Sequence, residues 1–237
     1  MRLMPRNILK LIAVFIVGAV GGIFADQILW PYFVERPLFY QYKLEQSPVY
    51  LTERKEVVIQ ENTALQESIE KVEKAVIKVR SQTAEGAVLE GSGLVLTSDG
   101  LIVTLAELVP QGSAFSFLVQ GKPVAFQILK RDLNYNLALV KLEAANFQSV
   151  SFADLNKTKL GERVFLVGVL KENKIIVNEG IIKNLDKNLI QTNIKEDVSL
   201  RGTPLFNIQG EVLGLNTIKE GEVLSIPVSL IREFSGF

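Results

Sequence analysis

The sequence predicts an all-β fold, a double β-barrel of two six-stranded barrels with short flanking helices, preceded by one N-terminal transmembrane helix. Three observations predict it. One long apolar run lies near the N-terminus, and short segments rich in Val, Ile and Leu follow from residue 76 onward. A polar stretch over Glu143–Leu160 divides these segments into two groups of six, as in a double barrel, although a sandwich would show similar periodicity.

The composition excludes several classes of enzyme. The 237 residues include no histidine and no cysteine, which rules out Ser-His-Asp and Cys-His hydrolases, Cys/His zinc sites, thiolate-held clusters and disulfides. The 26 basic and 26 acidic residues cancel, so the chain as a whole has no charge that would attract nucleic acid. We expect no cofactor and no metal, although carboxylate-only sites and a Ser-Lys or Asp/Glu mechanism remain open.

The apolar run Leu11–Ala25, with its apolar flanks, is about 20 residues long, which is enough to span a bilayer. Arg2, Arg6 and Lys10 precede it and Asp26 follows it. Because basic residues favour the cytoplasmic side, this pattern predicts a cytoplasmic N-terminus and an extracytoplasmic main domain.

The predicted segments are therefore a cytoplasmic end over 1–7, a transmembrane helix over 8–30 and a linker over 31–62. The expected localisation is the cell membrane, in a single pass. A cleaved signal peptide is the alternative, since a basic start and an apolar core also fit that pattern. Gly18 and Gly22 form a small-residue pair that could bring two such helices together, but glycine is common in membrane helices anyway.

The linker carries three prolines and shows no sustained periodicity. From Thr63 the apolar residues Leu65, Ile69 and Val72 recur at helical spacing, which predicts a short amphipathic helix capped by Asn62 or Thr63.

After this helix the chain alternates between strand-like segments and turns. We place barrel one at about 74–143 and barrel two at about 160–228, within a domain over 63–237 that ends in a short helix, Val228–Phe234. The predicted strands are 76–80, 94–97, 101–104, 114–120, 124–129 and 137–142, then 163–169, 174–182, 189–194, 204–207, 211–217 and 222–226.

Five blocks carry a resemblance to a known family. They are Gly91–Val109, with its Gly-Ser-Gly start, Asp132–Leu139, Gly161–Gly168, Gln191–Thr217 and the pair Ile226-Pro227. In this order they resemble trypsin-like serine proteases of the HtrA/Deg type, which have a chymotrypsin-like fold, over residues 64–234. The resemblance implies a trypsin-like double β-barrel.

The resemblance also indicates which positions to compare with the Ser-His-Asp triad. Glu107 stands at the histidine position, Asn136 at the aspartate position and Arg201 at the serine position. The family glycine that helps to line the oxyanion hole corresponds to Ser199, and Leu200 lies between Ser199 and Arg201. A serine adopts the required backbone less easily than a glycine.

These substitutions predict a pseudoprotease with no catalytic residues. A guanidinium stays protonated and cannot attack a carbonyl, and Asn136 cannot stabilise an imidazolium. We expect Glu107 and Arg201 to face each other as an ion pair, with Asn136 donating a hydrogen bond to the Glu107 carboxylate. The alternative is that both are unrelated surface charges.

The expected function is the binding of peptide or protein segments in the cell envelope by strand addition. The expected pairing strand is Glu222, Val223, Leu224, Ser225 and Ile226. Two alternatives are a residual or unconventional serine hydrolase of the endopeptidase type that uses Ser199, and a structural envelope protein. The family often carries a PDZ domain after the protease domain, and none is expected here because the sequence stops at Phe237. The sequence predicts no oligomeric state.

Overall fold

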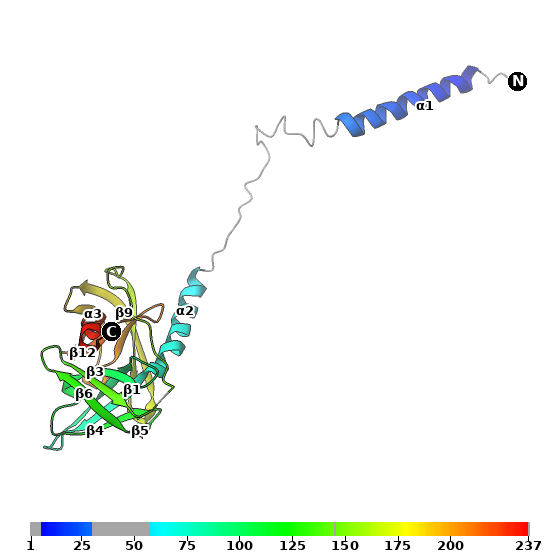
Figure 1. The fold of residues 1–237 in the computed structure, drawn as a ribbon. Helices are drawn as coiled ribbons and strands as arrows, with labels where there is room; N and C mark the ends of the chain where they lie inside the picture. The colour runs from blue at the N-terminus through cyan, green and yellow to red at the C-terminus, as the bar shows by residue number, and fades with distance from the viewer. Residues whose placement is uncertain (1–5, 30–56, 145, 237) are drawn as a thin grey trace. The chain divides into compact units, whose positions relative to one another are not determined.

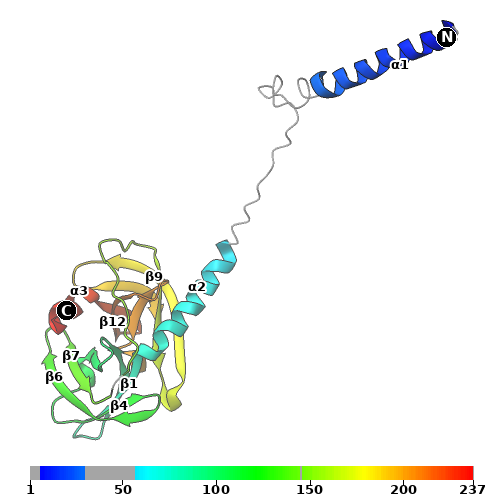
Figure 2. The ribbon, with the colours of Figure 1, turned by 45° about the vertical axis from the view of Figure 1, so that its right-hand side comes forward.

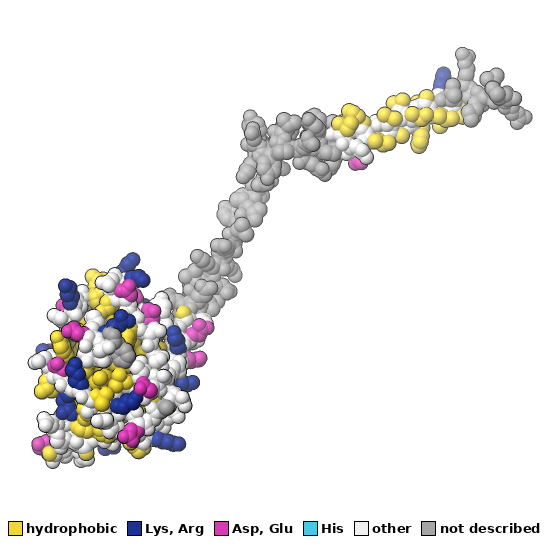
Figure 3. All heavy atoms as spheres, viewed as in Figure 1, with side chains coloured by type: hydrophobic (Ala, Val, Ile, Leu, Met, Phe, Trp, Pro, Cys, Tyr) yellow, Lys and Arg dark blue, Asp and Glu magenta, His cyan; other side chains and the backbone are white. Residues whose placement is uncertain are grey.

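The computed structural model describes residues 6–29, 57–144 and 146–236, and the chain forms two compact units, Met1–Lys55 and Glu56–Phe237. In the first unit, α1 (Arg6–Phe24) continues into a short π-helix, η1 (Ala25–Leu29). The 19 residues Lys10–Ile28 are long and apolar enough to cross a membrane. A signal sequence would pass the same test. Their side chains are exposed and appear as the yellow run along α1 in Figure 3.

The linker predicted over 31–62 lies outside the described residues as far as residue 56. Its last six residues belong to α2 (Val57–Val72), which begins before the predicted Thr63 and leads through the short 3₁₀ turn η4 (Glu73–Ala75) into the first strand.

The second unit is built from two β-sheets and confirms the predicted fold class (Figures 1 and 2). The cyan-to-green half is a seven-stranded sheet in the order β5-β4-β1-β2-β3-β7-β6, which forms an open half-barrel. Its strands are β1 (Val76–Gln82), β2 (Val88–Val95), β3 (Leu101–Leu105), β4 (Ala114–Val119), β5 (Lys122–Val124), β6 (Phe126–Asp132) and β7 (Leu137–Leu142). The prediction of six strands here was wrong by one, because segment 124–129 is divided between β5 and β6.

The yellow-to-orange half is a closed six-stranded barrel, as predicted, in the order β10-β13-β12-β11-β8-β9. Its strands are β8 (Arg163–Val169), β9 (Ile175–Leu185), β10 (Ile190–Lys195), β11 (Pro204–Asn207), β12 (Val212–Lys219) and β13 (Glu222–Pro227). The 3₁₀ turn η6 (Lys171–Asn173) lies at the tip of the β8–β9 hairpin.

Strand β2 begins six residues before the predicted Leu94, and this early start brings it beside the functional site. It pairs with β1 from Val88 onward, through the Gly-Ser-Gly segment. A Cβ at Gly91 would lie 2.4 Å from Leu108 Cδ1 and 2.6 Å from the Arg201 carbonyl oxygen. Only glycine therefore permits this approach of β2 to both neighbours.

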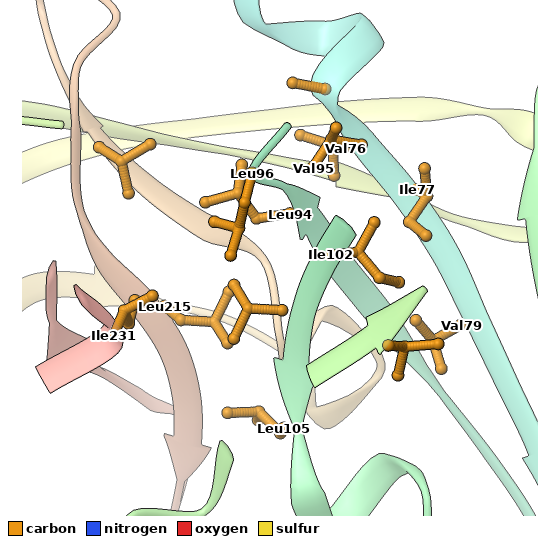
Figure 4. Close-up of a cluster of buried hydrophobic side chains, with 14 of the residues drawn as sticks. Val76, Ile77, Val79, Leu94, Val95, Leu96, Ile102, Leu105, Leu215 and Ile231 are labelled. Atoms are coloured by element: carbon orange, nitrogen blue, oxygen red, sulfur yellow. The ribbon is translucent and has the colours of Figure 1, made fainter. Parts of the chain in front are cut away.

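Buried aliphatic and aromatic side chains form the cores that pack against both sheets. The larger cluster draws on β1, β2, β3 and β7, and also on Leu215 of β12 and Ile231 of α3 (Val228–Ser235). Figure 4 shows Leu215 and Ile231 beside the side chains of the first sheet. A smaller cluster lies inside the closed barrel and includes Val164, Leu166 and Val223. Because the larger cluster spans both sheets, burial of apolar surface holds the two halves together.

The two helices of this unit are fixed by hydrogen bonds as well as by packing. Ser68 of α2 donates to the carbonyl oxygen of Ile208 at 2.7 Å, and Gln148 Nε2 donates to the carbonyl oxygen of Lys71 at 2.7 Å. Lys130 of β6 donates to the Phe234 carbonyl oxygen of α3 at 3.1 Å. The helix α2 is thus attached to the β11–β12 turn and to the segment between the sheets.

Candidate functional site

Glu107 lies in a 3₁₀ turn, η5 (Ala106–Leu108), directly after β3. Its neighbours Ala106 and Leu108 are buried, which fixes the turn and leaves the Glu107 side chain 38% exposed. The backbone N–H of Ala106 donates to the Asn136 carbonyl oxygen at 3.1 Å. The base of the site is therefore tied to the β6–β7 turn.

Asn136 ends that turn in the left-handed region, with φ 53°, which asparagine tolerates better than most residues. Asp132 shapes the turn, because its Oδ1 accepts from the N–H groups of Asn134 and Tyr135 at 2.8 and 3.1 Å. Asn136 Oδ1 then accepts from the Glu107 backbone N–H at 3.0 Å. The predicted donation from Asn136 to the Glu107 carboxylate is not found among the hydrogen bonds of the described residues, and the side-chain oxygen of Asn136 holds the Glu107 backbone.

Arg201 follows a second 3₁₀ turn, η7 (Val198–Leu200). Its backbone carbonyl oxygen accepts from the N–H of Ser92 on β2 at 2.9 Å. The next residue, Gly202, has φ +76°, and a Cβ there would lie 2.2 Å from the Ser92 carbonyl oxygen. The chain can pass β2 at this distance only because residue 202 is glycine.

The expected ion pair is present. Arg201 Nη1 lies 3.5 Å from Glu107 Oε2, and the side chains are 21% and 38% exposed. Arg201 Nε also donates to the Val198 carbonyl oxygen at 2.9 Å, which fixes the guanidinium over its own turn. The pair joins the two sheets, but a partly exposed pair at this distance adds little to stability.

The backbone N–H groups of residues 199–201 are engaged within the loop. The Ser199 N–H donates to Asp197 Oδ1 at 2.9 Å, the Leu200 N–H to the Asp197 carbonyl oxygen at 3.0 Å, and the Arg201 N–H to the Val198 carbonyl oxygen at 3.2 Å. The hydrogen bond from the Ser199 N–H holds the pKa of the Asp197 carboxyl below its usual range. Ser199 does not have a positive φ, so its backbone is outside the left-handed region that favours glycine.

A series of hydrogen bonds between buried polar side chains supports this loop. Ser225 Oγ donates to Asn216 Oδ1, and Asn216 Nδ2 donates to Thr203 Oγ1 at 3.1 Å. The Asn216 backbone also bonds to Gly202 and Thr203. All three side chains are buried, so their polar atoms need these partners.

Two surface hollows adjoin this site, one at Arg201 and one at Asn136. One, of about 660 Å³, is lined by Arg201 and by Val88, Leu89, Glu90, Leu170, Lys174, Asp197, Val198 and Ser199. The other, of about 370 Å³, is lined by Asn136 and by Asn134, Tyr135, Asn188, Thr217, Ile226 and Leu230. Arg201 therefore borders a hollow beside β2, and Asn136 borders a hollow beside β12.

The predicted pairing strand, Glu222–Ile226, lies in β13 and has both of its edges occupied. It pairs with β12 from Glu222 to Pro227, and with β10 at Glu222, Leu224 and Ser225. A peptide could not add to it without displacing a strand of the closed barrel, so this part of the prediction does not fit the pairing.

Two other strands have open edges toward the hollows. Strand β2 pairs with β3 only from Gly93, so its edge over 88–91 has no strand neighbour among the described residues. Strand β12 pairs with β11 only as far as Leu215, and beyond Asn216 the same edge is again without a neighbour in the described part. Sequence reasoning missed both, because a free edge depends on where the neighbouring strand ends.

The capping role of Asp197 was also missed. An aspartate two residues before a serine is a frequent cap at the start of a helical turn, and that pattern was the available signal.

These features define a class of protein. Two β-sheets of trypsin-like topology meet at a cleft, and the turns after β3, β6 and β10 bring one side chain each to its centre. The family model of the trypsin-like peptidase domain matches residues 91–215, more than half of the chain. The chain belongs to this family, and its relatives are of the HtrA/Deg type.

Three relatives give the scale of the similarity. A probable periplasmic serine endoprotease, DegP-like, of Rhizobium meliloti is 30% identical over 161 residues, which are 61% of this chain and 32% of that protein. Its counterpart in Halomonas elongata is 29% identical over 54% of this chain and 29% of its own length. The serine protease HTRA1A of Danio rerio is 31% identical over 70% of this chain and 39% of its own length. The matched part is thus about a third of each relative.

Proposed function

We propose that this protein is a membrane-anchored pseudoprotease that binds extended peptide or protein segments in the extracytoplasmic space. The observation that carries the proposal is the 3.5 Å contact between Glu107 and Arg201 at the centre of a trypsin-like cleft. We assign Glu107, Asn136 and Arg201 to the triad positions, and Ser199, Leu200 and Arg201 to the oxyanion loop.

The chemistry of these residues argues against proteolysis. An arginine guanidinium remains protonated and has no lone pair with which to attack a carbonyl carbon. Glu107 has a cation beside it instead of a hydroxyl group from which to remove a proton. The N–H groups of Ser199 and Arg201, which would have to stabilise an oxyanion, already donate within their own loop.

The open strand edges support peptide binding. The edge of β2 over 88–91 borders the hollow that Arg201 lines, and Thr217 of β12 borders the hollow that Asn136 lines. An extended segment that crosses the Glu107–Arg201 pair can add to both edges by backbone hydrogen bonds. We therefore assign the pairing to β2 and β12 in place of β13.

The location follows from the N-terminal helix. We propose that Lys10–Ile28 is retained as a single-pass anchor, with the basic N-terminus in the cytoplasm and the second unit outside. The DegP-like relatives are named periplasmic, which agrees with an extracytoplasmic domain.

One observation favours a second candidate, a serine hydrolase. Ser199 and Lys174 line the same hollow, and a lysine can activate a serine. Among the described residues, however, no hydrogen bond joins the two side chains.

The test is a casein-cleavage assay on the full chain in detergent micelles. We expect no cleavage by the natural sequence. Cleavage that Ser199→Ala abolishes would favour the hydrolase and contradict the pseudoprotease.

A set of revertants tests the positions themselves. The triple variant Glu107→His, Asn136→Asp, Arg201→Ser restores the triad, and adding Ser199→Gly frees the backbone of the oxyanion loop. We expect the quadruple variant to cleave casein about a hundredfold faster than the triple variant, since a single oxyanion donor contributes on that order. Equal rates would contradict our account of the oxyanion loop.

A further inference from the structure

The guanidinium of Arg201 has N–H groups that donate to no described residue. Of its five N–H groups, Nε–H donates to the Val198 carbonyl oxygen, and Nη1 faces Glu107 at 3.5 Å. The remaining groups have no acceptor among the described residues. Arg201 therefore presents a fixed, unfilled donor fork beside the 660 Å³ hollow that it lines.

The contact to Glu107 is weak enough to be replaced. Its distance exceeds that of a good charge-assisted hydrogen bond, and the Glu107 side chain is 38% exposed. Exposed ion pairs typically contribute about 0–1 kcal/mol, whereas a carboxylate that binds an arginine through two parallel N–H···O bonds is held more strongly. The Glu107 backbone is held separately by Asn136, so its side chain can turn away without disturbing the loop.

The same centre offers little to an uncharged carbonyl. The backbone N–H groups of residues 199–201 are engaged within the η7 turn, so an internal peptide bond finds no oxyanion-type donors there. A group that needs a cationic fork fits better than one that needs two backbone N–H groups.

The surrounding charges leave room for one further anion. Glu90 in the hollow is paired with Lys78 at 3.3 Å, and the Asp197 carboxylate accepts from the Ser199 N–H. Lys174 lines the hollow with no ion pair to any described residue. Lys174 and Arg201 thus supply positive charge that a new carboxylate can share.

We propose that the cleft captures the free C-terminus of a peptide, whose terminal carboxylate binds Arg201 in place of Glu107. This inference rests on the peptide binding proposed above and names its ligand. The residues before the carboxylate pair with the open edge of β12 beyond Asn216, beside the hollow that Thr217 and Asn136 line. The occupant is a chain end, such as that of a cleaved or unfolded protein, and not a segment that passes through the cleft.

The test compares two probes that differ only at the C-terminus. Both are fluorescein-labelled heptapeptides of alternating threonine and valine, one with a free carboxylate and one with a terminal amide. Fluorescence anisotropy with the full chain in detergent micelles should give about tenfold tighter binding of the acid than of the amide, because only the acid forms the charge-assisted pair.

Four variants assign the effect to residues. Arg201→Gln should remove the preference for the acid. Arg201→Lys should retain part of this preference, which would show that the loop still folds in a variant at this position. Glu107→Gln should tighten binding of the acid severalfold and leave the amide unchanged. Arg163→Gln is the matched control, since Arg163 is an ion-paired arginine of β8 outside both hollows, and it should change neither affinity.

The outcomes separate the two proposals. Equal binding of acid and amide by the natural sequence would overturn carboxylate capture and leave peptide binding intact. A preference that persists in Arg201→Gln would overturn the assignment to Arg201. Failure of both probes to bind would overturn the proposed peptide binding and, with it, this inference.

Discussion

At the scale of single residues, Gly202 fixes how closely the Arg201 loop approaches β2. Its φ of +76° and the 2.2 Å distance from a hypothetical Cβ to the Ser92 carbonyl oxygen act together. Gly112 has a similar φ of +80° but nothing within 4 Å of its hypothetical Cβ. A comparison of substitutions at the two glycines therefore separates the effect of backbone strain from the effect of a steric clash at Cβ.

We expect Gly202→Ala to lower the free energy of unfolding by more than about 3 kcal/mol, because strain and a steric clash add. Gly112→Ala should cost only about 1 kcal/mol, from strain alone. Chemical denaturation followed by circular dichroism measures both. Equal losses would show that the loop can move away from Ser92.

The ion pair leads to a smaller expected effect. Glu107→Gln should change the free energy of unfolding by less than about 1 kcal/mol, because both side chains are partly exposed and the contact is long. Chemical denaturation with and without 1 M salt checks this, since the pair is screened by ions. A loss of several kcal/mol would mean that the pair is essential to the fold.

Asp197 gives the η7 turn a dependence on pH. Its pKa is lowered in the folded state, chiefly by the hydrogen bond from the Ser199 N–H, so its stabilising effect is complete above the unfolded pKa. The effect is lost as the pH falls through the lower, folded pKa. We expect the protection of the Ser199 amide proton against exchange, relative to its intrinsic rate at the same pH, to fall as the pH drops through the folded pKa of Asp197, as measured by NMR, and Asp197→Asn to reduce this change.

Several residues of the site were predictable and others were not. Glu107 and Arg201 were placed together because a family pattern fixed their positions and opposite charges then implied a pair. The hydrogen bond from the Glu107 backbone to Asn136 was not predicted, since a sequence cannot tell which end of an amide faces a backbone N–H. The engaged N–H groups of residues 199–201 depend on the turn geometry that Asp197 imposes, which no spacing rule supplied.

At the scale of elements, β2 shows why strand limits are hard to predict. Its middle contains Gly91 and Gly93, which weaken the strand pattern, yet glycine is needed at residue 91 for close contact with Leu108 and Arg201. β13 shows the converse. Its alternating residues identified a strand correctly, but nothing in its sequence revealed that β10 and β12 cover both edges.

The attachment of α2 allows a further prediction. Ser68 is 7% exposed and donates to the Ile208 carbonyl oxygen in a part-buried hydrogen bond, so Ser68→Ala leaves that carbonyl without this partner. We expect a loss of about 1–2 kcal/mol in unfolding free energy and faster amide exchange in the β11–β12 turn, measured by hydrogen–deuterium exchange. Gln148→Ala is the control, because its bond to Lys71 is exposed and should contribute less.

At the scale of the whole molecule, the alternation of apolar residues was enough to predict two β-rich halves, and the closed barrel has the predicted six strands. The first half is open because its outermost strands, β5 and β6, do not pair with each other. The two halves share one apolar cluster, so we expect a single cooperative unfolding transition for residues 57–236. Calorimetry that resolved two transitions would contradict this.

The hydrogen bonds of α2 also determine how the folded unit responds to tension. Any pull that reaches the chain at residue 57 passes along α2, whose carbonyl at Lys71 and hydroxyl at Ser68 are bonded to Gln148 and to the β11–β12 turn. These bonds are loaded before β1 can be drawn out of its sheet. The β11–β12 turn follows β11, and β11 begins three residues after Arg201. A mechanical force on the N-terminal segment would therefore be transmitted through β11 to the cleft.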